Sequence, residues 1–138
     1  MTGNPYRDHL AERVLGADPL ELVILLYEEL ARSIGDARRA LAAANPRLRA
    51  RSISRAMEIV GELAQSVNPS ADPQLAARLS QLYTFLLDQL HSAHAHQLDA
   101  PLANAERVAR TLLEAWQAVR SAQIHSQPCE TPAVSLAG

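Results

Sequence analysis

The feature that most constrains the fold of this chain is a capping side chain followed directly by proline. It occurs at Asp18-Pro19, Asn45-Pro46 and Asp72-Pro73. Asp and Asn accept hydrogen bonds from the free N–H groups of a first helical turn, and proline fits the first helical position because no N–H is needed there. Each proline also ends the helix before it, since the residue preceding proline avoids the helical region. A fourth start is expected at Pro101, with Asp99 or Ala100 as its cap.

Composition agrees with helices and argues against most β folds. Ala supplies 25 positions and Leu 21, whereas aromatic residues make up only 4% of the 138 residues. This mixture favours helix over strand. We predict four helices of roughly 22 to 26 residues, each about 33–39 Å long at ~1.5 Å per residue. They are expected at residues 19–44, 46–67, 73–97 and 101–124. Near-equal lengths and short connections predict an all-α, antiparallel up-down-up-down four-helix bundle.

The same pattern predicts how the chain is organised. The bundle is expected at residues 18–125, after an N-terminal cap segment at residues 1–17. Residues 126–138 contain Pro128 and Pro132 and are too poor in core-forming residues to fold alone. We therefore expect these last residues to be a mobile, disordered tail.

Charge and cysteine content exclude several classes of partner. Thirteen basic residues, all Arg, stand against fifteen acidic ones, giving a net charge of -2. This balance disfavours nucleic-acid binding by phosphate neutralisation. The single cysteine, Cys129, forms no internal disulfide, which suits a reducing compartment. No apolar run reaches the ~18 residues of a membrane span, and the N-terminus is too polar for a signal peptide. A cytoplasmic protein without membrane insertion is predicted.

The sequence gives little support for a catalytic or metal-binding site. Asp88, His91 and His94 share one helix face, with His96 nearby, and two ligands one turn apart are the beginning of a metal site. A di-iron bundle also needs Glu-x-x-His motifs, which are missing from this sequence. Gly-x-Ser-x-Gly, His-Glu-x-x-His and phosphate-binding Gly-rich motifs are missing as well. We therefore predict a solvated polar face here, and no enzyme, cofactor or metal.

The helices carry more apolar residues than one core needs. Projection at about 100° per residue gives a buried stripe on each helix. The stripes include Tyr27 in the first helix, Leu75 in the third, and Trp116 and Val119 in the fourth. Further apolar residues fall outside these stripes or widen them: Leu22, Leu25, Leu26, Ile59, Leu87 and Leu113. Three explanations stay open: coverage by the N-terminal segment, an apolar groove for a partner helix or extended peptide, and homodimerisation.

Several motifs occur in a characteristic order. They are Asn4-Pro5-Tyr6, Ala-Asp-Pro-Leu-Glu-Leu at 17–22, Leu-Leu-Tyr at 25–27, Ala-Met-Glu-Ile-Val-Gly-Glu-Leu at 56–63, Leu-Tyr-Thr-Phe-Leu at 82–86 and Glu-Ala-Trp at 114–116. In order and spacing, this set resembles the flagellin-specific export chaperones of the FliS type. The resemblance covers nearly the whole folded part of the chain.

The resemblance implies a function for the surplus apolar surface. Such chaperones are helical bundles that bind the disordered C-terminal segment of flagellin, prevent its premature polymerisation and deliver it to the flagellar type III secretion apparatus. The predicted walls of the binding groove are Leu22, Leu25, Leu26, Ile59, Leu87 and Leu113. Tyr6 and His9 correspond to the N-terminal aromatic pair of the family, and this segment is expected to cover part of the groove when the client is absent.

Other partners and functions remain open at this stage. Contact with the flagellar export gate and homodimer formation are both compatible with the sequence. The alternative functions are a helical homo-oligomeric adaptor, a metal-binding bundle without a flagellin client, and an export chaperone for another client.

Overall fold

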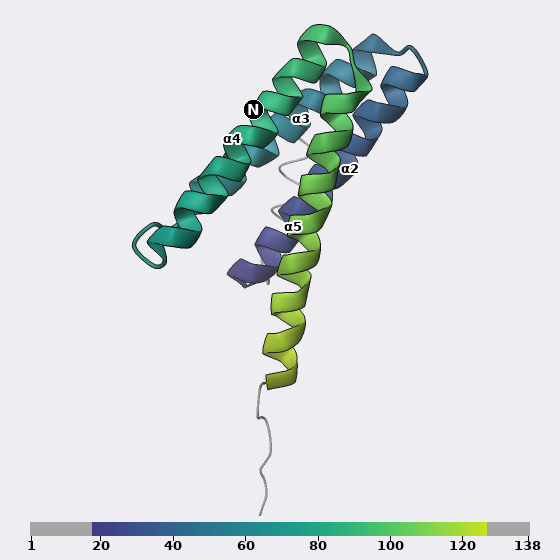
Figure 1. Ribbon diagram of the computed structural model, residues 1–138. Helices are drawn as coiled ribbons and strands as arrows, with labels where there is room; N and C mark the ends of the chain where they lie inside the picture. The colour runs from purple at the N-terminus through teal and green to yellow at the C-terminus, as the bar shows by residue number, and fades with distance from the viewer. Residues whose placement is uncertain (1–17, 127–138) are drawn as a thin grey trace, which may run out of the picture.

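The structure, a computed structural model, describes residues 18–126 and contains four α-helices in that range. The helices are α2 (Pro19–Ala42), α3 (Pro46–Gln65), α4 (Pro73–His96) and α5 (Asp99–Ser126). Their order and near-antiparallel succession are visible in Figure 1. The prediction of an all-α four-helix bundle is confirmed. Residues 1–17 and 127–138 lie outside the described residues. The predicted N-terminal cap segment and C-terminal tail therefore stay predictions.

Three helices begin at the predicted caps. Asp18, Asn45 and Asp72 each accept a hydrogen bond from a backbone N–H three residues ahead. The N···O distances are 2.8 Å for Asp18 and 3.1 Å for the other two. Each cap satisfies one of the donors that a helix start leaves unpaired, and the following proline removes another. Local sequence therefore determines where these helices start.

The fourth helix start differs from the prediction. Asp99 is the first residue of α5 rather than its cap. Its carboxylate accepts two hydrogen bonds of 2.9 Å from the Arg38 guanidinium on α2, which also donates to Glu106 at 2.8 Å. A forked arginine contact of this kind fixes geometry as well as charge. The side chain expected to cap α5 thus ties α5 to α2.

Each helix packs mainly against two neighbours. α2 contacts α3 and α5, and α4 also contacts α3 and α5. The connection between α4 and α5 is only two residues long, and Gln97 in it adopts the left-handed conformation with φ 56° and ψ 45°. From this connection the two helices diverge, so that the start of α4 lies well away from the second half of α5 (Figure 1).

The core is wider on α2 and α3 than a single stripe. Leu25, Leu26 and Ile59 are buried, and the last two belong to the main hydrophobic core. The expectation that these three lie outside the core is therefore wrong. The reason is that α2 and α3 pack against each other more extensively than any other pair of the described helices, so their buried arc exceeds one stripe. By contrast, Leu75 and Val119 were expected in the core but are 42% and 41% exposed, since they lie where α4 and α5 diverge.

Candidate functional site

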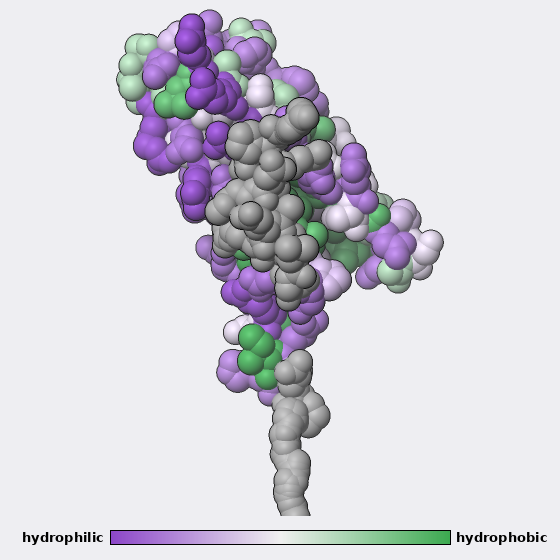
Figure 2. Space-filling model, turned by 180° about the vertical axis from the view of Figure 1, so that it is seen from behind, coloured by the Kyte–Doolittle hydropathy of each residue, from purple (hydrophilic) through white to green (hydrophobic). Residues whose placement is uncertain are grey.

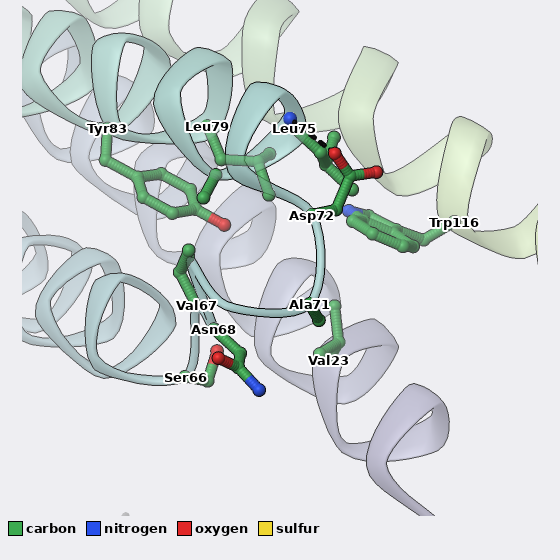
Figure 3. A pocket seen from close by; sticks show the side chains of 11 residues that line it. Val23, Ser66, Val67, Asn68, Ala71, Asp72, Leu75, Leu79, Tyr83 and Trp116 are labelled. Atoms are coloured by element: carbon green, nitrogen blue, oxygen red, sulfur yellow. Dashed lines mark hydrogen bonds between the residues drawn. The ribbon is translucent and has the colours of Figure 1, made fainter.

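An apolar cleft of about 200 Å³ lies at the end of the bundle that holds the α3–α4 connection. It is bounded by α2, the connection, the first half of α4 and the second half of α5 (Figure 3). The lining residues are Val23, Ser66, Val67, Asn68, Ala71, Asp72, Leu75, Ala76, Leu79, Tyr83 and Trp116. Because α4 and α5 diverge, this end of the bundle has a concave surface. In a closed four-helix bundle the same position would be filled by core side chains.

The walls of the cleft are largely apolar and partly accessible. Leu75 stands at its edge, Val23 and Trp116 are half-buried, and Leu79 is buried at 8% exposure. Figure 2 shows apolar surface in the hollow beside the projecting α3–α4 end, at right, with hydrophilic surface around it. An accessible apolar surface inside a polar rim is typical of a site that binds another chain.

The α3–α4 connection forms a structured wall. The side-chain oxygen of Asn68 accepts a hydrogen bond of 3.0 Å from the N–H of Ser70. The main-chain carbonyl of Asn68 accepts a second one, of 3.2 Å, from the N–H of Ala71. Asp72 then caps α4. These local bonds hold the connection as a turn, so the cleft has a preformed shape.

A pair of tyrosines lies next to the cleft, and one of them, Tyr83, belongs to its lining. The hydroxyls of Tyr27 on α2 and Tyr83 on α4 are 2.7 Å apart in a buried hydrogen bond that joins two helices which are not main packing neighbours. Burial raises the pKa of both phenols above its ordinary value, and for Tyr27 the contact with Tyr83 adds to the effect. Both side chains are therefore neutral hydrogen-bonding groups under ordinary conditions.

Trp116, on α5, completes the polar part of the cleft. Its indole nitrogen is buried and has no hydrogen-bond partner among the described residues. The indole lies close to the Tyr27 hydroxyl and partly opposes the rise of the Tyr27 pKa. The orientation of the two groups, however, does not form a hydrogen bond. In Figure 3 the nitrogen of Trp116 points toward the interior of the cleft.

Comparison with known families agrees with this geometry. A model of the flagellar protein FliS family matches residues 2–123, a range that includes all the described residues of the cleft lining. This chain belongs to the FliS family. FliS proteins are flagellar export chaperones rather than enzymes, so the predicted chaperone class and its role in flagellum assembly are confirmed. No curated protein matches the chain.

The structure of this FliS-family chain separates the predicted groove residues into two groups. Leu22, Leu87 and Leu113 are half-buried and pack against the core from outside. The other three, Leu25, Leu26 and Ile59, are buried. None of the six lines the cleft, and their part in client binding stays a prediction. Tyr6 and His9 lie outside the described residues.

The cleft residues were missed for a definable reason. Leu75, Leu79 and Trp116 fall on the stripes predicted to be buried, and Val23 and Tyr83 look equally like core residues. These residues line the cleft, and are not enclosed in the core, because α4 diverges from α5. The one local signal was the polar α3–α4 connection, whose Asn68 and Pro69 marked a turn.

The described helices also show where the predicted histidine face lies. Asp88, His91, His94 and His96 are all exposed, as expected for a solvated polar face. Within residues 18–126 there is no group of three or more His, Cys, Asp or Glu side chains arranged to hold a metal ion. None of the four described helices has a stretch long and apolar enough to cross a membrane.

Proposed function

We propose that this chain is a cytoplasmic flagellin export chaperone that binds the disordered C-terminal segment of flagellin in its apolar cleft. The bound segment is kept from premature polymerisation and is handed to the flagellar type III secretion apparatus. The observation that carries the proposal is the accessible apolar cleft between α4 and α5, in a chain of the FliS family.

The geometry of the cleft suits a client that must later leave. Burial of apolar area drives binding, whereas a disordered segment loses conformational entropy when it becomes ordered, which limits the affinity. The described part of the cleft lining has one carboxylate, that of Asp72, and no basic side chain. Binding to such a surface depends weakly on salt, and release requires no change in charge.

The experiment is a calorimetric titration of the full chain with the C-terminal segment of flagellin from the same organism. We expect one-to-one binding with a negative heat-capacity change, the signature of apolar burial. Light scattering then reports whether the chain delays flagellin polymerisation at equal concentration. Absence of binding, together with a dimer in sedimentation, would favour the homo-oligomeric adaptor instead.

The finer assignments made from the family resemblance remain proposals. They place Leu22, Leu25, Leu26, Ile59, Leu87 and Leu113 at the client interface. They also place the segment with Tyr6 and His9 over part of the groove when no client is bound. Deletion of residues 1–17 would then increase the affinity for flagellin in the same titration, and an unchanged affinity would refute the covering role. Pull-down assays would test contact with the export gate.

A further inference from the structure

The charged side chains of the described bundle are separated between its two halves. The midpoints of the helices divide residues 18–126 into a half that holds the cleft and a far half, which comprises residues 31–55 and 85–112. Nine of the eleven described arginines lie in the far half, whereas eight of the twelve described acidic residues lie in the half with the cleft. The far half is therefore positive and the half with the cleft is negative, although the whole chain has a net charge of only -2.

Ion pairs neutralise most of the acidic side chains in the far half. Three of the four form such pairs: Asp36 with Arg39, Asp99 with Arg38, and Glu106 with Arg38 and Arg110. The fourth, Asp88, lies more than two turns before the end of α4. By contrast, three exposed arginines of the far half have no ion pair within residues 18–126: Arg47, Arg51 and Arg107. The positive charge of this half is therefore not balanced within the described residues.

Exposed leucines accompany this charge. Leu48, in the first turn of α3, is 40% exposed, and Leu98, in the connection between α4 and α5, is 54% exposed. Both turns lie at the same end of the bundle, at the top of Figure 1. Figure 2 shows a mostly hydrophilic surface at this end, with small apolar areas within it. We call Arg47, Leu48, Arg51 and Leu98 the basic end.

The arrangement favours a phospholipid surface over other anionic ligands. Guanidinium groups bind phosphate through paired hydrogen bonds, and leucines gain from contact with a lipid interface but not with nucleic acid. Residues 43–51 and 94–99 contain no Phe, Tyr or Trp on which a nucleic-acid base could stack. An acidic peptide would be expected in a groove, whereas Leu48 and Leu98 lie on two separate turns. A flat, extended surface can contact both turns at once.

We infer that the basic end docks on the surface of a membrane that contains anionic phospholipids. Arg47 and Arg51 contact lipid phosphates, and Leu48 and Leu98 enter the headgroup region. The same surface repels the negative half of the bundle, so the cleft is turned away from the lipid. The inference does not depend on the identity of the client.

Vesicle sedimentation with the full chain tests the inference. The probes are vesicles of phosphatidylglycerol mixed with phosphatidylcholine and, as a control without net charge, vesicles of phosphatidylcholine alone. We expect binding to the anionic vesicles only. This binding should weaken by about tenfold or more when the salt rises from about 0.1 M to about 1 M, because the Debye length falls from about 10 Å to about 3 Å. No binding to the anionic vesicles at the lower salt concentration would overturn the inference.

Matched arginine variants locate the contact. One basic side chain near an anionic surface is worth about fivefold in binding, so Arg47→Gln and Arg51→Gln should each weaken vesicle binding about fivefold, and together about 30-fold. Arg78→Gln removes the same charge from the half with the cleft, where Arg78 is exposed and has no ion pair within residues 18–126. It should leave vesicle binding unchanged. Equal effects of the three single variants would show a response to net charge alone and would refute the inference.

The leucines distinguish a lipid surface from other polyanions. Leu48→Gln and Leu98→Gln should each weaken vesicle binding about fivefold, since the exposed part of a leucine no longer enters the lipid. Neither change should affect binding to a single-stranded oligonucleotide, and Leu75→Gln should leave vesicle binding unchanged. Vesicle binding that is insensitive to both leucines would overturn the inference, and tight oligonucleotide binding beside it would assign the basic end to nucleic acid.

The position of the cleft gives a separate measurement. Because the cleft lies at the opposite end of the bundle, the flagellin C-terminal segment should sediment together with the vesicle-bound chain. Displacement of the chain from the vesicles by this segment would contradict the inferred orientation. A segment that binds the chain neither in solution nor on vesicles would refute the proposed function, whereas the vesicle binding would stand.

Discussion

Leu75 and Leu48 form a matched pair for testing the cleft. Each is the third residue of a helix that begins with proline, and each donates its N–H to the cap residue over 3.1 Å. Their side chains are equally accessible, at 42% for Leu75 and 40% for Leu48. Only Leu75 lines the cleft. The two changes Leu75→Glu and Leu48→Glu therefore differ in location but hardly in local structure.

The expected loss of affinity follows from burial. Complete burial of a leucine side chain is worth about 1.5–3 kcal/mol, and the exposed two-fifths of Leu75 leaves about 1 kcal/mol for the client to gain. A glutamate in its place also loses hydration against an apolar client, which adds at least about 1 kcal/mol. The sum of about 2 kcal/mol corresponds to roughly 30-fold weaker binding for Leu75→Glu. Leu48→Glu should bind as wild type does.

Both variants should remain folded, which makes the comparison decisive. Each change removes the buried three-fifths of a leucine side chain, and the favourable interaction of a first-turn glutamate with the helix dipole, about 0.3–1 kcal/mol, offsets part of that loss, so both variants should lose a similar and small amount of thermal stability. Circular dichroism melts provide this control, and calorimetric titration with the flagellin C-terminal segment provides the affinities. Equal affinity of the two variants would show that the cleft does not bind the client, and the reasoning from exposed apolar surface would be wrong.

Three further predictions concern the groups that shape the fold. Asp72→Ala should destabilise the chain by about 1 kcal/mol in urea denaturation because α4 loses its cap, whereas Asp72→Asn should be close to neutral. Tyr27→Phe should cost about 1 kcal/mol in the same assay, since it leaves the facing hydroxyl unpaired, and a neutral effect would show that the pair contributes nothing. Hydrogen bonds from Arg38 lower the pKa of Asp99, so their stabilisation is present above the ordinary carboxylate pKa of about 4 and is lost as pH falls further. Arg38→Gln should therefore reduce stability at pH 7 more than at pH 2, by a small amount because the pair is half-exposed and screened by salt; an equal effect at both pH values would refute the linkage.

The parts of the fold that sequence could predict are those with local causes. The three capped starts depend on an Asp or Asn and the proline that follows, and the structure has all three. Helix count and order follow from those starts and from the short connections. Asp99 shows the limit of this reasoning. The same residue type serves as a cap elsewhere, but here a distant arginine determines its role.

The candidate site depended on geometry between helices that no local pattern contains. Leu75 lies on a predicted core stripe, and nothing in its sequence neighbourhood indicates that α5 has moved away from it. Leu26 presents the opposite case: it lies off the predicted stripe but is buried in the main hydrophobic core. Arg49 is a second residue whose burial the sequence did not indicate: it belongs to an Arg-rich stretch, yet it is 8% exposed, and its buried Nε has no hydrogen-bond partner within residues 18–126. The stripe analysis detected an excess of apolar residues, but three of those that it placed outside the core, Leu25, Leu26 and Ile59, are buried.

The two-residue reversal at Gln97 sets the angle between α4 and α5, and with it the width of the cleft. It pins α4 to α5 at one end, and the far end of α4 lies about 36 Å away at ~1.5 Å per residue. A rotation of about 5° at the pinned end moves the opposite end by roughly 3 Å over this length, which is close to the width of a methyl group. The aperture of the cleft therefore depends on an angle that is fixed at the opposite end of α4, whereas the hydrogen bonds of Asn68 and Asp72 fix the connection that forms its near wall.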